Sequence, residues 1–387
     1  MSSGSTTRRK LLAGSGGMLA GSSSLRAQNY PLRDHSRVPA MDELATVMEF
    51  EAVAFAKLSR EAYTFTAHGS EGEFTLRRNR QAFDWVELIP KGVVDVSAVD
   101  TASEILGTPM AFPIMAAPTA GHAELHRDGE LATHQGATAA ANTPMIVSNN
   151  ASFPMDKIAE AAKGPLWFQL YPRQDLNATR ALLDAAVAAG SKAVVVTVDQ
   201  QASYSERQIH NRHLAAPRQV RSGGAPANPY RVPESRLWYE WKYADSVRSM
   251  LKVPMIAKGI LTAEDARLCM EHGFDAIYVS NHGGRSLDYD PSTLEVLPEI
   301  VDAVEGRVPV LFDSGILSGT DVLKALALGA KAACIGRGIR WGLGAYGAPG
   351  VQRVLEILQA ELVMAMAQTG KPNLASLDRT MVRTQFP

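Results

Sequence analysis

Short apolar runs alternate with amphipathic segments over most of the chain after residue 100. Each run is rich in Val, Ile, Leu, Ala or Met and is bounded by Pro, Gly or a polar residue. This pattern is typical of parallel strands that are buried on both faces of a sheet. Eight runs have it, at residues 112–120, 144–150, 166–171, 192–199, 253–259, 276–282, 308–314 and 332–338.

The segments between these runs have the periodicity of amphipathic helices, most clearly at 178–190, 263–273 and 319–330. Most runs start 22 to 32 residues apart, which is the length of one strand–helix unit. Eight successive units favour a (β/α)8 TIM barrel of the α/β class over an open sheet. Residues 41–66 are predicted to form an N-terminal helical cap, and residues 354–370 the last barrel helix.

One interval breaks this spacing, between the runs that start at residues 192 and 253. It contains a stretch rich in Pro, Gly, Ser and Arg at 213–235. Such a composition predicts a loop and not a packed element. We therefore expect a loop or lid insertion at 200–235, after the fourth strand of a barrel that spans residues 41–370.

Polar residues and glycines follow almost every predicted strand. The carboxyl ends of the strands of a TIM barrel share one rim, where active sites lie. A single polar strand end commonly caps the next helix, but a full set at one rim indicates a binding site. The candidates, in chain order, are Thr119, Ala120, Ser148, Gln169, Tyr171, Thr197, Asp199, Lys258, Ser280, His282, Arg285, Asp313, Gly315, Gly336 and Arg337.

Four of these residues suggest chemistry. His282 can accept a proton near neutral pH, and a carboxylate such as Asp199 would hold its tautomer and stabilise its charged form. The planar fork of Arg285 suits a carboxylate. Lys258 would place a positive charge beside a cofactor that gains electrons. The loops after strands seven and eight, with Gly315, Gly336 and Arg337, form the usual phosphate site of such barrels.

Several strings together resemble the FMN-dependent α-hydroxy-acid oxidase family, which includes glycolate oxidase, lactate oxidase and mandelate dehydrogenase. The resemblance covers residues 41–370. It implies oxidation of a 2-hydroxy acid to a 2-oxo acid on FMN, with His282 as catalytic base, Asp199 as its partner and Lys258 at the flavin. The strings are APTA (117–120), FQLY (168–171), TVD (197–199), VSNHGGR (279–285), DSG (313–315), GTDV (319–322) and IGR (335–337).

The resemblance also assigns binding roles to the other rim residues. Arg285 and Tyr171 would hold the substrate. The flavin contacts implied are Thr119, Ala120, Ser148, Gln169, Thr197, Lys258, Ser280, Asp313, Gly315, Gly336 and Arg337.

Three positions depart from the family pattern. Phe65 stands where the family has an active-site tyrosine in the substrate site. The segment 203–212 lacks the family's second substrate arginine, and Arg207 is a candidate replacement. Leu317 stands where relatives carry a phosphate-binding arginine, for which Arg340 is a candidate substitute. These changes predict a larger or less acidic substrate than glycolate or lactate.

Two other functions stay open at this point. One is the same FMN chemistry on an amine or a peptide-derived compound, which Phe65 and the altered 203–212 segment favour. The other is a flavin-binding or electron-carrying barrel without turnover, which the His282, Asp199, Lys258 and Arg285 set disfavours. Oxygen, a quinone or a cytochrome would accept the electrons. The chain has no haem attachment motif, so any such carrier would be a separate partner. Family analogy implies a homotetramer.

Charge and cysteine content exclude some other classes. The formal net charge is -1, and no cluster of basic residues indicates a nucleic-acid partner. Cys269 and Cys334 fall in a predicted helix and a predicted strand, so we expect two separate buried thiols and no disulfide or metal site.

The first 27 residues resemble a twin-arginine export signal. Arg8 and Arg9 stand directly before a mildly apolar run from Leu11 to Leu19, and Ala27 offers a cleavage point. The run is too short and too rich in glycine for a membrane span. We therefore expect a periplasmic or secreted protein, with a cytoplasmic one as the alternative.

Overall fold

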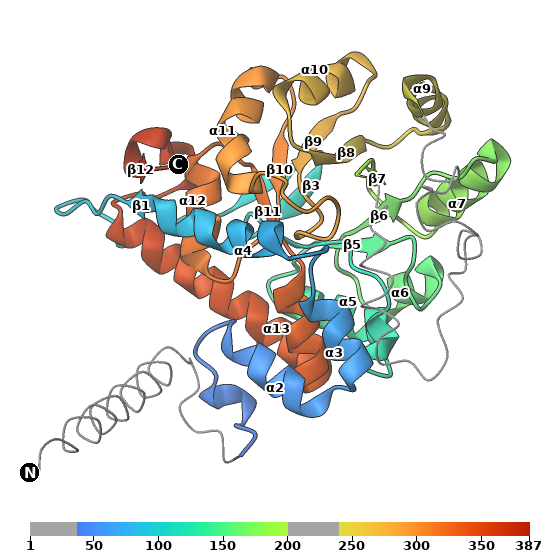
Figure 1. Ribbon diagram of the computed structural model, residues 1–387. Coiled ribbons are helices and arrows are strands. Elements are labelled where there is room, and N and C mark those ends of the chain that lie inside the picture. Colours follow the sequence, from blue (N-terminus) through green and yellow to red (C-terminus); the bar gives the residue numbers. More distant parts are fainter. Residues whose placement is uncertain (1–36, 200–239) are drawn as a thin grey trace, which may run out of the picture.

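The computed structural model describes residues 37–199 and 240–387, and these contain a closed barrel of eight parallel strands (Figure 1). The last strand pairs with the first, at Cys334 and Met115, which closes the ring. Each predicted strand run contains one barrel strand, so the predicted TIM barrel is confirmed. The strands are β4 (Ile114–Ala116), β5 (Met145–Ser148), β6 (Leu166–Leu170), β7 (Val194–Thr197), β8 (Met255–Ile260), β9 (Ala276–Val279), β10 (Val310–Phe312) and β11 (Ala332–Ile335).

Alternate residues of each strand enter two separate apolar clusters. On β6, Trp167 packs with the cluster that fills the barrel, whereas Phe168 joins the cluster under the surrounding helices. A hairpin of β2 (Ser103–Ile105) and β3 (Thr108–Met110) adds Ile105 and Met110 to the inner cluster. Because both faces of the strands are buried, their sequences are continuous apolar runs without a polar face.

The helices between the strands occur where the sequence periodicity places them. The predictions at 178–190, 263–273 and 319–330 correspond to α7, α10 and α12. Side-chain caps start several helices, including the reciprocal pairs Ser292–Glu295 and Ser318–Asp321. The barrel helices are α5 (Gly129–Ala139), α6 (Met155–Ala161), α7 (Leu176–Ala188), α9 (Trp241–Met250), α10 (Ala263–Glu271), α11 (Thr293–Val304), α12 (Gly319–Ala327) and α13 (Arg337–Gln368).

The last helix is longer than the predicted 354–370. It begins at Arg337, directly after β11, and is kinked at Tyr346 and Gly347. Glycines at its start weaken the apolar periodicity, so its first half is not visible as a helix in the sequence. They are needed for packing: a Cβ on Gly342 would lie 2.6 Å from the carbonyl oxygen of Gly350.

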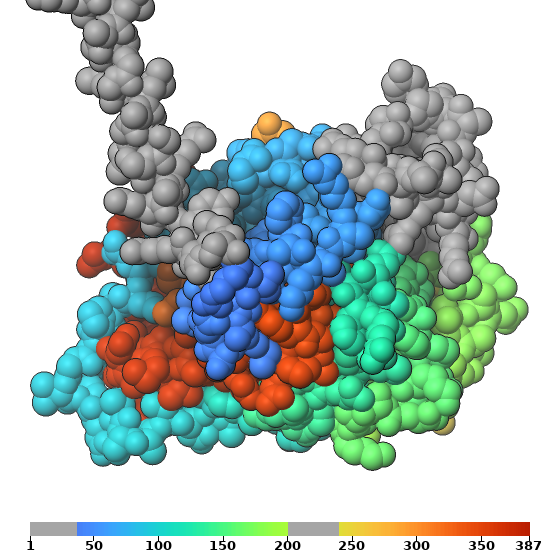
Figure 2. Space-filling view, turned by 90° about the horizontal axis from the view of Figure 1, so that it is seen from below, coloured from blue at the N-terminus to red at the C-terminus, as the bar shows by residue number. Residues whose placement is uncertain are grey.

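The N-terminal cap is broken into short helices and is not the continuous helix predicted for 41–66. The chain forms η1 (Met41–Glu43), α2 (Glu49–Lys57) and α3 (Arg60–Ala67). The break before α3 comes from Ser59, whose side chain accepts a hydrogen bond from the Ala62 N–H and so starts a new helix. Figure 2 shows this cap, in blue, seated against α13, in red.

A further helix, α4 (Phe74–Gln81), follows the cap and was not predicted. The chain then passes through η2 (Ala82–Trp85) to β1 (Val86–Leu88), which pairs with β12 (Val382–Thr384) near the C-terminus. The remaining short helices are η3 (His122–Glu124), η5 (Leu374–Ser376) and η6 (Arg379–Met381).

Three features complete the description of the chain. The predicted export signal at 1–27 and the predicted insertion at 200–235 lie outside the described residues. Cys269 and Cys334 are both buried and free, as predicted. Among the helices of 37–199 and 240–387, none combines the length and the apolar character required to cross a bilayer.

The crossing of α12 and α13 provides a test of the packing. An added Cβ at Gly319 would lie 2.2 Å from the Leu362 nitrogen and 2.5 Å from the Leu358 carbonyl oxygen, and backbone atoms cannot move aside as a flexible side chain does. We expect Gly319→Ala to lower stability by about 2–3 kcal/mol, seen as a fall of several degrees in Tm. The matched control is Gly92→Ala, where an added Cβ meets nothing within 4 Å. Equal Tm values for the two variants would contradict this crossing.

Candidate active site

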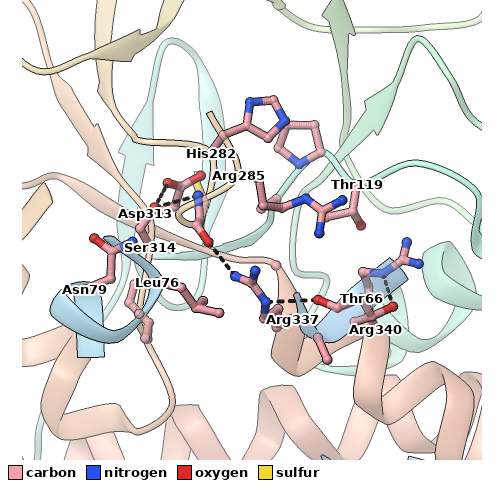
Figure 3. Close-up of a pocket in the computed structure, with 18 of the residues that line it drawn as sticks. Thr66, Leu76, Asn79, Thr119, His282, Arg285, Asp313, Ser314, Arg337 and Arg340 are labelled. Carbon is pink, nitrogen blue, oxygen red and sulfur yellow. Dashed lines mark hydrogen bonds between the residues drawn. The ribbon is translucent and has the colours of Figure 1, made fainter. Parts of the chain in front are cut away.

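A cavity of about 550 Å³ opens at the carboxyl ends of the barrel strands and is roofed by the cap helices α3 and α4. This volume lies within the range of small-molecule and cofactor sites. Rim residues from both halves of the barrel line it, including Thr119, Ser148, Tyr171, Lys258 and Asp313. The barrel therefore brings these parts of the sequence to one site, as predicted. Figure 3 shows ten of the lining residues with labels.

His282 and Asp199 form a hydrogen-bonded pair at this rim. The distance from His282 Nδ1 to Asp199 Oδ2 is 2.9 Å, and the two side chains are 16% and 8% exposed. The other ring nitrogen, Nε2, lies 3.2 Å from the Tyr171 hydroxyl. Because Asp199 accepts from Nδ1–H, Nε2 is the nitrogen with a free lone pair on the cavity side. His282 lines the cavity, and Asp199 lies behind it.

His282 has a backbone φ of +59°, in the left-handed region that few residues other than glycine adopt. Gly283 and Gly284 follow with φ of +69° and +73°. Ser280 supports the turn, since its hydroxyl accepts a hydrogen bond from the His282 N–H at 3.1 Å. Such strain is characteristic of functional sites, where the surrounding structure holds it in place.

Lys258 lies at the bottom of the cavity and is 3% exposed. Its Nζ donates a hydrogen bond to Ser280 Oγ at 3.0 Å and lies 5.5 Å from the centre of the Tyr278 ring. Neither partner carries a negative charge that would balance the ammonium group. The lysine is therefore placed to stabilise negative charge on a bound molecule.

A chain of hydrogen bonds connects β5, β6 and β7 beneath the cavity. Ser148 Oγ donates to Gln169 Oε1 at 3.2 Å, and Gln169 Nε2 donates to Thr197 Oγ1 at 2.9 Å. Ser148 lines the cavity, whereas Gln169, Thr197 and Ser280 lie below its surface. These three predicted contact residues support the cavity floor in the structure.

Two predicted ligand-binding arginines bind the end of α3. Arg337 donates to the carbonyl oxygens of Thr66, Gly283 and His68 at 3.0, 2.8 and 2.9 Å. Arg285 Nη1 donates to the carbonyl oxygens of Phe65 and His68 at 2.8 and 3.1 Å. The last carbonyl groups of a helix have no partner within the helix and carry partial negative charge, which explains their attraction for guanidinium groups.

A third arginine, Arg340, completes this group. Its Nε donates to Thr66 Oγ1 at 2.9 Å, and its Nη1 donates to the carbonyl oxygen of Ala120. In Figure 3 it lies on the side of Arg337 that faces away from Asp313 and Ser314. The described hydrogen bonds of Arg340 are therefore to α3 and to the segment after β4, whereas Leu317, whose missing arginine it was a candidate to replace, follows β10. Arg207, the other candidate replacement, lies outside the described residues.

The cavity is electropositive. Burial, together with the positive charge of Arg285, lowers the pKa values of Arg337 and Arg340 to about 9. Burial and the charge of Arg340 hold the pKa of His122 well below its usual value, so this histidine is neutral. Guanidinium groups that are buried with like charges favour an anionic ligand.

Phe65 and Leu317, at two of the three positions that depart from the family pattern, line the cavity. The centre of the Phe65 ring lies 5.0 Å from Arg285 Cζ and 5.2 Å from Arg340 Cζ. Leu317 has its backbone N–H bound to Asp321 at 2.9 Å, and its side chain adds no charge.

Sequence reasoning missed the residues that fasten α4 over the site. Asn79 and Asn281 exchange hydrogen bonds at 2.8 and 2.7 Å. Asp288 accepts from the N–H groups of Gly72 at 3.0 Å and Thr75 at 2.9 Å, which places a carboxylate at the start of α4. The sequence signal was weak, because each pair joins segments about 200 residues apart.

Asp290 was also missed. Burial raises its pKa from 3.8 to about 6, and the negative charges of Asp199 and Asp288 add to this effect. A second carboxylate thus lies close enough to the partner of His282 to interact with its charge.

The raised pKa of Asp290 predicts a pH-dependent stability. Between about pH 4 and 6 the Asp290 carboxyl binds its proton more tightly in the folded protein than in the unfolded chain. The free energy of unfolding therefore falls as the pH rises through 6. Because the side chain is partly open to solvent, we expect a change of only about 1 kcal/mol. Urea unfolding at pH 4.5 and pH 7 should show the loss in the wild type and not in Asp290→Asn. Parallel profiles for the two proteins would contradict the raised pKa.

The comparisons with known proteins show which family the chain belongs to. The model of the FMN-dependent dehydrogenase family matches residues 54–384. A peroxisomal (S)-2-hydroxyacid oxidase of Arabidopsis thaliana is 40% identical over 358 residues, which cover 89% of this chain and 98% of the relative. The glycolate oxidase of Spinacia oleracea is 37% identical over 358 residues and covers 89% of this chain and 97% of the relative.

Solved structures of mandelate oxidase are also similar to this chain. A crystal structure of a mandelate oxidase superposes with a TM-score of 0.79 at 36% identity, covering 89% of this chain and 99% of that protein. A structure of mandelate oxidase with benzoylformic acid gives the same TM-score of 0.79.

Proposed function

The chain belongs to the FMN-dependent dehydrogenase family, and we propose that it oxidises a 2-hydroxy acid to the corresponding 2-oxo acid with His282 as the base. The observation that carries this proposal is the His282–Asp199 pair, whose Nε2 faces a cavity lined by cationic side chains. Oxygen or another acceptor would then take up the electrons. The relatives that are named for a substrate act on 2-hydroxy acids or mandelate.

The cavity fits FMN. When bound, FMN accepts the two electrons that leave the substrate. Lys258 supplies the positive charge that a flavin gaining electrons needs, and Arg337 is the cation suited to the phosphate. α13 begins at Arg337, so its first N–H groups add to this anion site. The other residues that we propose to hold FMN are Thr119, Ala120, Ser148, Asp313, Gly315 and Gly336, with Gln169, Thr197 and Ser280 in support.

The protein's own groups divide the chemical work. His282 removes the proton from the substrate at Nε2, and Asp199 stabilises the resulting positive charge through Nδ1. The Tyr171 hydroxyl, 3.2 Å from Nε2, orients the substrate hydroxyl toward the base. Arg285 binds the carboxylate. The cap helices limit access of water, which strengthens these electrostatic contacts.

The alternative substrate classes are less favoured. Amine or peptide-derived substrates would leave the positive charge around Arg285 without a carboxylate to bind. Phe65 adds an apolar wall where the family pattern has a hydroxyl, and we propose on this ground a 2-hydroxy acid with an apolar or bulky side chain. The electron acceptor and the homotetramer stay predictions.

Replacing the base tests the proposed function. The FMN-loaded protein is mixed anaerobically with a panel of 2-hydroxy acids, and bleaching of the flavin absorbance is followed. We expect at least one acid to bleach the wild type and His282→Gln to react roughly 10²- to 10⁴-fold more slowly, with unchanged flavin content.

The matched control is His272→Gln, because His272 also pairs with an aspartate, at 2.7 Å from Asp245, but does not line the cavity. It should bleach at the wild-type rate. Absence of bleaching by every acid, or full-rate bleaching in His282→Gln, would remove the basis of the proposal.

We further propose that residues 1–27 are an export signal read by a twin-arginine system. The support is the Arg8-Arg9 pair before the apolar run. Residues 1–40 fused to a reporter should direct the reporter out of the cytoplasm of a bacterium that has this pathway. Changing Arg8 and Arg9 to Lys should keep the reporter in the cytoplasm. Arg26→Lys serves as control and should leave export intact. Retention of the unaltered fusion would count against the signal.

A further inference from the structure

We propose that Arg340 is a substrate-binding residue that acts with Arg285 on the carboxylate of the substrate. This inference depends on the proposed function. It gives Arg340 a role different from the phosphate binding that its sequence position first suggested. The second guanidinium for the substrate would then come from the helix after the last barrel strand and not from the segment after β7.

Position is the first argument. Arg340 lies one helical turn after Arg337, but its contacts are with Thr66 and Ala120, on the β4 side of the cavity. Arg337 donates to the Gly283 carbonyl oxygen and lies between Ser314 and Thr66 in Figure 3, whereas Arg340 and Arg285 lie on the side of Thr119. The two arginines of α13 thus serve different parts of the cavity, and Arg340 shares its part with Arg285.

Phe65 connects Arg340 to the substrate position. Both Arg285 Cζ and Arg340 Cζ lie close to its ring centre, at 5.0 and 5.2 Å. Phe65 stands where the family pattern has a tyrosine hydroxyl, so that a polar contact is lost at this point. A guanidinium beside the same ring can supply the missing donor, and with a charge that the hydroxyl did not have.

Unbalanced charge is the second argument. Arg340 is 3% exposed, and its Nη2 has no hydrogen-bond partner among the described residues. The acceptors of its other two nitrogens are a hydroxyl and a carbonyl oxygen, both without net charge. Glu130 offsets part of the charge from a distance, since it is hydrogen-bonded to the His122 N–H and not to Arg340. A buried cation with a free donor on a cavity wall is completed by an anion.

A purely structural role would not require the charge. The bonds to Thr66 and Ala120 join α3 to β4, and a neutral amide can make bonds of this kind. A carboxylate has two oxygens, so that Arg285 and Arg340 can each bind one of them. The charge of Arg340, which no carboxylate balances through a described hydrogen bond, is thereby accounted for.

The test compares Arg340→Gln with the wild type, both loaded with FMN, because Gln keeps an N–H donor group and removes the charge. Benzoylformate and its neutral amide serve as probes, and binding is followed by the change in flavin absorbance without turnover. Loss of a charge-assisted contact should weaken benzoylformate binding roughly 10- to 100-fold. Binding of the amide should change less than about threefold.

Kinetics and rescue variants separate binding from stability. With mandelate, KM should rise by the same factor while kcat changes little. Arg340→Lys should recover part of the affinity, and adding Phe65→Tyr to Arg340→Gln should recover part through the tyrosine hydroxyl. Arg379→Gln, which removes a surface ion pair with Asp302, is the matched control and should behave as the wild type.

The outcomes distinguish the two proposals. Equal weakening of benzoylformate and its amide, or unchanged binding in Arg340→Gln, overturns the role of Arg340 and leaves the proposed function in place. Failure of the wild type to bind any of the probes, together with no bleaching by any 2-hydroxy acid, overturns both. If Arg340→Gln does not retain FMN, Arg340→Lys provides the comparison. The double variant Arg340→Lys, Phe65→Ala is then measured as well, and wild-type affinity of this variant for benzoylformate would also overturn the inference.

Discussion

Closure of the barrel is the constraint on which the rest of the structure depends. β11 pairs with β4 and completes a ring in which all eight strands run in the same direction. Every strand therefore ends at one rim, and residues as distant in sequence as Thr119, Lys258 and Arg337 line one cavity. The apolar inner cluster around Trp167 and Tyr278 fills the barrel below this rim. Ligands are thus confined to the carboxyl end.

Hydrogen bonds from three arginines hold the cap over the rim. Arg285, Arg337 and Arg340 donate to backbone or hydroxyl oxygens at the end of α3. Burial lowers the pKa values of Arg337 and Arg340, and the positive charge of Arg285 contributes to the lowering, so these like charges repel one another. An anionic cofactor and an anionic substrate would relieve that repulsion. Ligand binding should therefore stabilise the joint between cap and barrel.

The base, His282, combines backbone strain with hydrogen bonds that hold it in position. His282 adopts a left-handed backbone that costs free energy, and Asp199 behind it and the Ser280 hydroxyl beneath it hold the ring in place. The Gly283–Gly284 turn lets the chain leave the strand sharply, so Arg285 points back toward α3. Base and carboxylate-binding group are in this way fixed by one short turn.

The sequence by itself determined the barrel, its eight strands and most of the rim, because strands buried on both faces leave an apolar signal and strand ends leave a polar one. It also identified His282, Asp199 and Lys258 as candidates, since local strings carry them. It failed for the broken cap, the start of α13 and the Asn79–Asn281 pair. Only the tertiary structure decided which part of the cavity each arginine side chain lines. Arg337 and Arg340 are three residues apart in one helix, yet their partners come from different strands and from α3, and side-chain direction between distant elements leaves no local pattern.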